Sequence, residues 1–515
     1  MAGTNVKACS RTDPSVNSAV GDKDMVVEET TTAMYDERNM TLMEGFLFWK
    51  KAIAFSFFIS LAVIMEGYDT SLMNNFFPFP KFKNKFGDEV DPDGGRLVSA
   101  RWQTIILNGT QVGCIIGLVL NGYLSEWLGY KKTMVATMTA MVAAIFIPFF
   151  STSLNMYLAG GFIQGLPWAY MTSWVNICWV LGGLLSTGIL RGLLNIDIVI
   201  ATLLCPESPW WLVRQGRLEE AKAAMRKLTS PRPGMEFDVD SHVEMMVVTD
   251  KFERQAQAGT NYWHCFQKSD LRRTEISAMV CITQAFCGVP FMGYGVQFME
   301  RAGLETDTAF NLNVVQSCVG LIGCILAWWL MTYFGRRFLY LAGLSSMFAI
   351  LMAIGFLGLA PESSSGAGWA VGGLIIFMLF LFQMSLGPIC YAVFAEIAST
   401  RLRVKTVVIA RASYNCAVFV NNAIMPKIVG KNDWNWGAKG GFFWAGIDLL
   451  FLVWTWFRLP ESQGLSYAEL DLLFEHKVPT RQFSQERADA LRPALDEIAA
   501  EEKRRSRIPT VEIVV

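Results

Sequence analysis

The chain carries the same pair of short motifs twice. A glycine followed by basic residues occurs at Gly129, before Tyr-Lys-Lys, and at Gly335, before Arg-Arg. Each copy leads through further apolar segments to a Pro-Glu-Ser motif, which begins at Pro206 and again at Pro460. The interval is 77 residues in the first half and 125 in the second, a difference of 48. A duplicated hydrophobic chain is typical of secondary transporters built from repeats.

Composition places most of the chain in a membrane. Hydrophobic residues make up 52% of the 515 residues, and charged residues only 17%. The apolar segments approach the roughly 20 residues that cross a bilayer as a helix. A net charge of −1 argues against a nucleic-acid partner. We therefore expect an all-α membrane protein surrounded by the lipid bilayer.

The residue patterns of enzymes and metal proteins are missing from the sequence. The eleven cysteines are scattered without a CxxC pair, and the three histidines lie outside the predicted spans. No nucleophile triad or phosphate loop has a useful spacing. We therefore predict that the chain is not an enzyme and uses no metal, haem or other cofactor.

The second half of the chain has the pattern of one complete repeat of six helices. Its apolar stretches lie near residues 276–299, 309–331, 338–360, 369–395, 406–428 and 440–459. Basic residues mark alternate loops, at Arg336, at Arg401 and from Arg458 onward. Loops rich in Lys and Arg face the cytosol, so these loops and the C-terminal tail are predicted to be cytosolic.

The first half begins in the same way but runs short of helices. Spans near 48–71, 100–124 and 133–152 are followed by 52 residues that naturally make two crossings before Pro206. The next segment, 206–275, holds eleven Lys and Arg and should be cytosolic. Reaching it from the outer end of the third span requires an odd number of crossings. The N-terminal bundle is therefore predicted to be incomplete.

These patterns divide the chain into five predicted regions. The first 45 residues mix acids, Thr and Ser without an apolar core, so we expect no cleavable signal peptide there. The regions are a disordered cytosolic tail (1–45), a shortened N-terminal helical bundle (46–205), a cytosolic inter-bundle loop (206–275), a C-terminal six-helix bundle (276–459) and a cytosolic tail (460–515).

Four unrelated motifs then occur in one order along the chain. They are Glu66-Gly-Tyr-Asp-Thr, Pro206-Glu-Ser-Pro-Trp-Trp-Leu-Val-Arg, Gly387-Pro followed by Ala395-Glu-Ile, and Asn435-Trp-Gly-Ala-Lys. With them the chain resembles the fungal maltose (α-glucoside) permeases, of the sugar porter branch of the major facilitator superfamily, over about residues 40–475. The resemblance implies two six-helix bundles with the sugar between them and proton-coupled uptake. We expect a monomer in the plasma membrane with both termini cytosolic.

The chain departs from these relatives at two places. They normally finish the fourth helix after Trp168, turn through a cytosolic Glu-x-x-x-x-Arg motif and enter a fifth helix resembling 174–194. Here only residues 169–171 join the two. A second gap falls after Asn195, where the loop and most of helix six should stand. Two gaps of about one short helix each match the 48-residue deficit.

Two carboxylates of the first span are candidates for proton coupling. Glu66 and Asp69 lie three residues apart, on neighbouring faces of one helix. An acid within the membrane is costly and often relays protons from a water-filled cavity. Both could instead sit at the wet end of the helix, where Gly67 loosens the backbone. By resemblance, Asp69 is the better candidate.

Four residues of the second half are candidates for sugar binding. A sugar needs hydrogen-bonding groups at its edges and flat aromatic surfaces on its faces. By resemblance, Gln284 matches the first Gln of the seventh-helix motif, and Tyr391 stands where the tenth-helix motif has Trp. Arg411 lies in the eleventh span, with Asn415 one turn beyond. Each could also serve packing alone, and Arg411 could extend to the cytosolic interface.

The duplicated motifs predict a cytosolic gate. Basic side chains in the loops can engage glutamates near the cytosolic helix ends and hold that face shut until substrate binds. The gating candidates are Lys131, Lys132, Glu207, Arg336, Arg337, Glu396, Arg401 and Arg403, with Glu461 in the second Pro-Glu-Ser. The basic residues could equally serve only to anchor the loops in the cytosol.

Three functions remain open for a chain of this kind. The first is a proton-coupled sugar transporter that works by alternating access and is impaired by the missing helix material. The second is a sugar sensor that binds without transporting. The third is a degenerate paralogue, or a gene whose coding stretches were removed as introns. The transcript across 168–172 and 195–205 would separate the last from the others.

Overall fold

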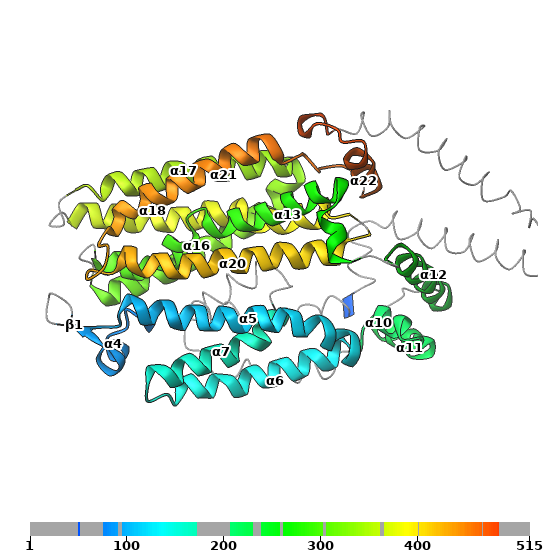
Figure 1. Cartoon of the computed structure of the whole chain (residues 1–515), viewed down its shortest axis with the longest axis horizontal. Coiled ribbons are helices and arrows are strands. Elements are labelled where there is room, and N and C mark those ends of the chain that lie inside the picture. Colours follow the sequence, from blue (N-terminus) through cyan, green and yellow to red (C-terminus); the bar gives the residue numbers. More distant parts are fainter. Residues whose placement is uncertain are drawn as a thin grey trace, which may run out of the picture. The chain divides into compact units, whose positions relative to one another are not determined.

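The computed structural model of the chain is almost entirely helical where it is described (Figure 1). It forms two compact units. Unit 1 includes the described segments 50–51, 124–135, 206–229 and 238–257, and unit 2 includes the other described residues. The structure describes residues 50–51, 76–90, 95–171, 206–229, 238–257, 261–301, 305–360, 365–399, 401–465 and 467–483.

Each of the six apolar stretches predicted in the second half contains helix. The helices are α13 (Lys268–Phe286), α14 (Val289–Gly293), α15 (Gly295–Arg301), α16 (Thr306–Tyr333), α17 (Arg336–Leu357), α18 (Ser365–Met384), α19 (Leu386–Ile397), α20 (Arg403–Val429) and α21 (Gly440–Arg458). Two of the six stretches contain more than one helix. The stretch 276–299 is divided among α13, α14 and α15, and the stretch 369–395 is interrupted at Ser385.

The break after α13 has a local cause. Gly288 has a φ of +97°, in the left-handed region that residues with a side chain rarely adopt. Pro290 lies in the first turn of α14 and has no backbone N–H with which to continue the preceding helix. A hydrophobicity plot cannot detect this interruption, because both sides of it are apolar.

In the first half the structure describes one short helix, a two-stranded hairpin and three long helices. They are α4 (Pro80–Phe86), β1 (Glu89–Val90), β2 (Arg96–Leu97), α5 (Ala100–Leu128), α6 (Tyr130–Phe149) and α7 (Leu154–Met171). The two short strands pair antiparallel, with Glu89 opposite Leu97. The helix α7 continues through the first junction, at 169–171. Residues 172–205, which hold the second junction, lie outside the described residues, so the incomplete N-terminal bundle is not tested there.

Unit 1 contains three short helices of the predicted inter-bundle loop: α10 (Pro209–Arg214), α11 (Leu218–Leu228) and α12 (Val239–Gln257). They enclose a small apolar cluster around Trp211, Met225 and Val243. At the start of α12, Asp238 accepts hydrogen bonds from the Ser241 hydroxyl and the Asp240 N–H. These bonds lower the pKa of the Asp238 carboxyl, because they stabilise its charged form.

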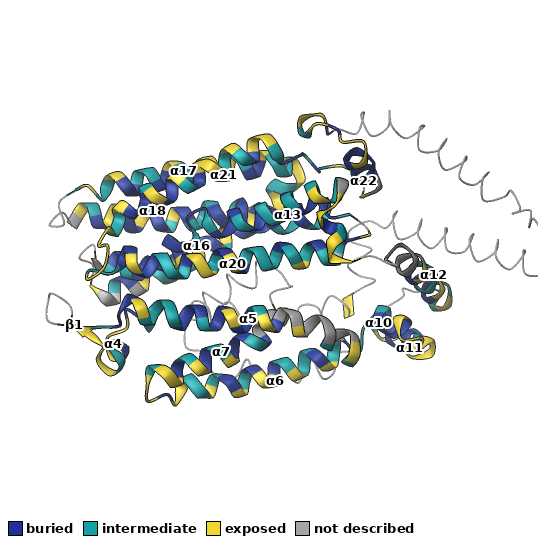
Figure 2. Cartoon of the chain, viewed as in Figure 1, coloured by how far each residue is buried: buried dark blue, intermediate teal, exposed yellow. Residues whose placement is uncertain are grey.

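The helices of the second half pack within unit 2 in pairs, α16 with α18, α13 with α20 and α17 with α21. Along α17 the buried residues recur every three to four positions, as a helix with one face in a core requires. Figure 2 shows buried and exposed residues interspersed along these helices. The exposed positions include large apolar side chains such as Trp329 and Phe457, which suit contact with lipid. Five described stretches are long and apolar enough to cross a membrane.

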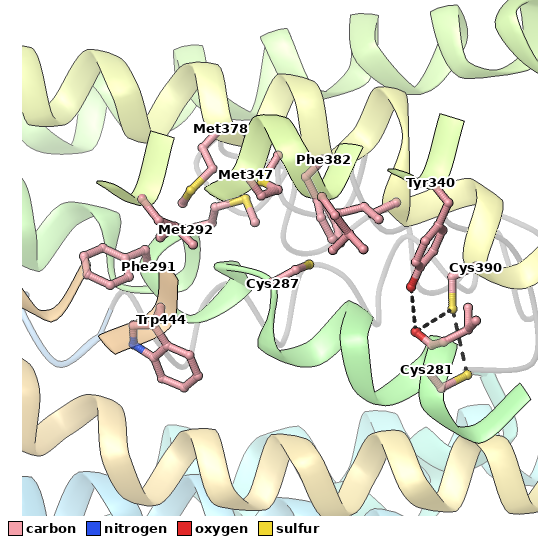
Figure 3. Packing of buried hydrophobic residues seen from close by; sticks show 14 of the residues in the cluster. Cys281, Cys287, Phe291, Met292, Tyr340, Met347, Met378, Phe382, Cys390 and Trp444 are labelled. Atoms are coloured by element: carbon pink, nitrogen blue, oxygen red, sulfur yellow. Dashed lines mark hydrogen bonds between the residues drawn. The ribbon is translucent and has the colours of Figure 1, made fainter. Parts of the chain in front are cut away.

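The core of unit 2 contains several sulfur and aromatic side chains (Figure 3). Phe291 and Met292 of α14 lie in it with Met347 of α17 and Met378 of α18. At one end the Tyr340 hydroxyl donates a hydrogen bond of 3.0 Å to the carbonyl of Val280. The Cys281 and Cys390 sulfurs lie 3.8 Å apart beside it. These contacts tie α17 and α19 to α13, the helix that carries Gln284.

Substituting Gly288 should test the cause of the helix break. We expect Gly288→Ala to destabilise the detergent-purified protein by about 1–2 kcal/mol, because alanine resists the left-handed conformation and its Cβ would lie 3.2 Å from the Met378 sulfur. Gly373→Ala in α18 is the matched control, since a Cβ there meets no atom within 4 Å. Thermal unfolding measures both. Equal melting temperatures for Gly288→Ala and wild type would contradict the explanation.

Candidate functional site

The first copy of the duplicated motifs forms a single contact within unit 1. Glu207 of Pro-Glu-Ser accepts a hydrogen bond of 2.9 Å at Oε1 from the backbone N–H of Lys131, in the first turn of α6. Gly129 precedes that helix with a φ of +92°. A Cβ on Gly129 would lie 2.9 Å from the other carboxylate oxygen. The glycine therefore lets the carboxylate approach the start of the helix.

The second copy repeats this geometry within unit 2. Glu461 accepts hydrogen bonds from the backbone N–H groups of Arg336, at 2.8 Å, and Arg337, at 3.2 Å. Both residues lie in the first turn of α17. A Cβ on Gly335 would overlap the carboxylate. The first N–H groups of a helix have no partner inside it and carry its positive end, so a carboxylate there is stabilising.

The side chain of Arg336 extends the second contact to a further helix. Its guanidinium forms an ion pair with Glu396 near the end of α19, with Nη2 and Oε1 3.2 Å apart. It also donates to the carbonyl of Met331 in α16. The second oxygen of Glu396 accepts a hydrogen bond from the Ser462 hydroxyl. One network thus joins α16, α17, α19 and the segment after α21.

The other basic gating candidates reach the glutamates through backbone N–H groups, at Lys131 and Arg337, or form other contacts. In the first copy the described hydrogen bond to Glu207 comes from the backbone N–H of Lys131, and Lys132 is exposed. The expected contact between lysine and glutamate side chains is not among the described contacts of this copy. Arg337 donates to the carbonyl of Trp456 at 2.8 Å. Arg401 pairs with Asp270 at 3.3 Å, and Arg403 lies over the ring of Tyr467. Among these described side chains, Arg336 is the one that forms an ion pair with a predicted partner, Glu396.

Arg411 and Tyr391 lie together between α19 and α20. The Arg411 guanidinium donates a hydrogen bond of 3.1 Å to the Tyr391 hydroxyl. Its central carbon lies 5.6 Å from the Tyr391 ring centroid and 5.0 Å from that of Tyr414. Aromatic faces attract a guanidinium at this range. The side chain is therefore directed at neighbouring protein groups.

Gln284 and Asn415 are buried, each only 4% exposed. Gln284 donates at 3.2 Å to the carbonyl of Gly387, on the helix that carries Tyr391. Its Oε1 has no hydrogen-bond partner among the described residues. Buried acceptors in folded proteins are usually hydrogen-bonded. Asn421 of α20 donates to the carbonyl of Ala285 at 2.7 Å.

Two residues of this region escaped the sequence analysis. Tyr414 was detectable, since it lies three positions after Arg411 and hence on the same side of one helix. Asp448 is fully buried in α21, and neither of its carboxylate oxygens has a hydrogen-bond partner among the described residues. The sequence offered one signal for Asp448, because it is the lone acid inside the apolar stretch 440–459. A buried intramembrane acid is a candidate functional group.

Glu66 and Asp69 lie outside the described residues, so their part in proton coupling stays a prediction. Within the described ranges, no group of three or more His, Cys, Asp or Glu side chains is arranged to hold a metal ion. What is described of the site consists of neutral hydrogen-bonding groups, aromatic rings, one guanidinium and the buried acid Asp448. Such a set is suited to binding a polar ligand.

The carboxylate contact of the second repeat can be tested by Glu461→Gln. We expect a loss of about 1.5–3 kcal/mol in stability, because hydrogen bonds to charged groups contribute about that much and the amide loses one acceptor oxygen. The control is Glu475→Gln, at an exposed position near the same end of the chain. Thermal unfolding in detergent compares the two. Identical effects of both substitutions would show that the contact contributes little.

Comparison with known proteins places the chain among sugar carriers. The family model "Sugar (and other) transporter" matches residues 55–178 and 183–474. The maltose permease MAL61 of Saccharomyces cerevisiae is 31% identical over 509 residues, covering 90% of this chain and 82% of that protein. The alpha-glucosides permease MPH3 of the same yeast is 32% identical, covering 90% and 84%.

Solved structures of the proton:xylose symporter XylE are similar in fold. With 6-bromo-6-deoxy-D-glucose bound, XylE superposes with a TM-score of 0.63 at 18% identity, covering 82% of this chain and 99% of that one. The inward-open form from E. coli gives 0.62. At this identity the likeness concerns the fold alone.

Proposed function

The chain belongs to the sugar transporter family of the major facilitator superfamily, and from that premise we propose that it is a proton-coupled transporter of maltose or another α-glucoside. Three predictions are confirmed by the comparisons: the resemblance to the maltose permeases, the major facilitator fold, and a function other than enzyme catalysis. The chain is a multi-pass membrane protein. The plasma membrane, cytosolic termini and a monomeric state belong to the proposal.

The choice of α-glucosides is supported first by the relatives. Those at 31–32% identity over nine tenths of the chain are named for maltose and alpha-glucosides. The chemistry of the described site agrees. Gln284 and Arg411 offer donors, Gln284 an open acceptor, and Tyr391 an aromatic face. A pyranose ring needs this combination of polar edges and apolar faces.

The observation that carries the proposal is the orientation of Arg411. A guanidinium that served only as an interfacial anchor would extend along lipid toward the headgroups. Here it lies beside two tyrosine rings and donates to one of their hydroxyls. Placing a charged group among protein side chains within a membrane is costly and marks substrate or ion pathways.

Proton coupling is supported by the resemblance to the permeases and by the likeness in fold to XylE, a proton:xylose symporter. In this chain Asp69 is the first candidate to carry the proton, with Glu66 beside it. Protonation of a carboxylate removes its charge. The free-energy cost of moving this group between the two states of the transporter is then lower. The sugar would then move with the proton down the electrochemical gradient.

Alternating access requires contacts that form in one conformational state and break in the other, and the motif contacts can have this role. The network of Arg336, Glu396, Glu461 and Ser462 joins four segments at the end of unit 2 that the charge distribution assigns to the cytosol. Moving these helices apart would break charge-assisted hydrogen bonds, so the network favours one state until sugar binding compensates for its loss. The equivalent contact of the first repeat would act likewise.

The shortened first half bears on activity. The missing helix material predicts that the chain as it stands transports poorly, since an incomplete bundle exposes cavity walls to lipid. A sugar sensor, or a degenerate or mis-spliced paralogue, remains the alternative. Restoring the two gaps from the pattern of the relatives would separate these functions, because a sensor should stay unable to accumulate sugar.

Uptake in a transport-null fungal strain tests the proposal. We expect weak accumulation of radiolabelled maltose by the chain as it stands and strong accumulation by the gap-restored chain, with surface expression matched. In the restored chain Asp69→Asn should abolish accumulation but leave downhill exchange, because it removes the titrating group and little volume. Unchanged alkalinisation of the medium upon sugar addition would exclude Asp69 as the coupling residue.

Arg411 allows a second test, of the binding chemistry. We expect Arg411→Lys to lose sugar affinity almost as severely as Arg411→Ala, because lysine keeps the charge but not the planar fork of donors. An interfacial anchor would tolerate lysine. Maltose affinity is measured for both variants in the gap-restored chain. A lysine variant that binds like the unsubstituted chain would remove Arg411 from the site.

A further inference from the structure

A cavity of about 440 Å³ lies in unit 2 at the opposite end of the α16 helix from the second copy of the duplicated motifs. Its walls come from three distant parts of the chain: the segment leading into α5, the α15 helix, and the segment after α20. The α16 helix begins beside this cavity, after Glu305, and ends just before Gly335. The charge distribution that assigns Gly335 to the cytosol therefore assigns the cavity to the outer face.

Three polar atoms in the side chains that line the cavity lack partners among the described residues. They are Gln103 Oε1, Gln297 Nε2 and Glu300 Oε1. Two of these side chains are held by their other polar atom. Gln103 donates through Nε2 to the Val98 carbonyl at 2.9 Å, and Glu300 pairs through Oε2 with Lys83 at 3.3 Å. The arrangement holds two buried acceptors without a partner among the described residues, and a donor without one occurs in the same wall.

An aromatic ring is also present in the wall. Phe77 lines the cavity and is only 3% exposed, and it packs edge-on against Phe82 of α4. Val98 and Pro426 add further apolar surface. A rigid ring next to separate hydrogen-bond donors and acceptors is the composition of a site for a polar ligand with apolar faces.

The charges of the wall disfavour an anionic ligand. Four carboxylates line the cavity, at Glu89, Glu300, Glu305 and Asp433, against two lysines, Lys83 and Lys431. Lys83 already pairs with Glu300, and Glu89 accepts a hydrogen bond from Asn432 that joins two of the walls. A neutral polyhydroxylated molecule meets no such repulsion. A volume of about 440 Å³ lies within the range of small-molecule sites.

We propose that this cavity is a second, outer sugar site, which binds a neutral α-glucoside before the sugar reaches the cluster around Arg411. Gln103 and Glu300 accept hydrogen bonds from sugar hydroxyls, Gln297 donates one, and Phe77 contacts an apolar face. The inference rests on the proposed function only for the identity of the sugar. Arg411 is not among the residues that line this cavity; of its helix α20, only the C-terminal residues Pro426 and Val429 reach the wall.

Protection of an introduced cysteine tests the outer site directly. Gln297→Cys, within the cavity wall, is labelled from outside intact cells with a membrane-impermeant methanethiosulfonate, and labelling of the unsubstituted chain is subtracted. We expect maltose at about ten times its Kd to slow the reaction about tenfold, because the free fraction of the site falls accordingly. Lys81→Cys on exposed α4, outside the cavity wall, is the control and should react at one rate throughout. Gln103→Cys provides a second position should Gln297→Cys fail to reach the surface.

The same experiment in an Arg411→Ala background separates the two sites. Protection that persists there supports binding in the outer cavity itself, even if the chain accumulates no sugar. Protection lost in that background would show that the cysteine only reported a conformational change driven from the inner cluster, and would overturn the proposal. Equal labelling rates with and without maltose, or slowing at Lys81→Cys as well, would overturn it too.

A charge-neutral variant tests the role of Lys83. Lys83→Met should raise the maltose concentration for half-protection about tenfold, because Glu300 loses the partner that orients it, at a cost of about 1.4 kcal/mol. Lys81→Met is its matched control on the same helix and should leave that concentration unchanged. Equal half-protection concentrations for the two variants would exclude the ion pair of Lys83 with Glu300 from the site.

Discussion

A carboxylate bound to the first backbone N–H groups of a helix joins distant segments in both halves of this protein. Glu207 reaches the start of α6, and Glu461 reaches the start of α17. Both approaches require a glycine without a side chain just before the helix, which explains why Gly-basic and Pro-Glu-Ser motifs occur together in each repeat. The contact uses backbone groups. The basic side chains can therefore bind other partners, as that of Arg336 does with Glu396.

Much of the fold could be predicted from the order of apolar and basic segments, and the family from motifs such as that at Pro206. Hydropathy could not predict the interruptions at Gly288 and Ser385, because it is unchanged across them, although Gly288 and Pro290 are residue types that interrupt helices. Gln284 and Arg411 were chosen through resemblance and spacing. The contacts that orient them depend on side chains from other helices, which no spacing within one helix reveals. Asp448 was not among the predicted site residues, although it is the lone acid in an apolar stretch of the sequence.

The polar groups of unit 2 are arranged at different levels of the helices. The Arg336 network lies at one end, the Arg411 cluster is built within the packed helices α19 and α20, and the polar cavity near Gln297 lies at the other end. A sugar that passed these three polar levels in turn would exchange its hydrogen bonds in steps, and would thereby avoid one large desolvation cost. The breaks at Gly288 and Ser385 divide two of the apolar stretches into shorter helices.

Hydrogen exchange at the first turns of α6 and α17 tests most directly whether the carboxylate contacts form a switch. In the purified, gap-restored protein, peptides covering 130–134 and 335–339 should exchange slowly without sugar, because Glu207 and Glu461 hold their amides. Saturating maltose should speed exchange in both peptides if sugar binding opens the cytosolic face. Rapid exchange before sugar is added would contradict the contacts. Slow exchange that maltose leaves unchanged would contradict their role as a switch.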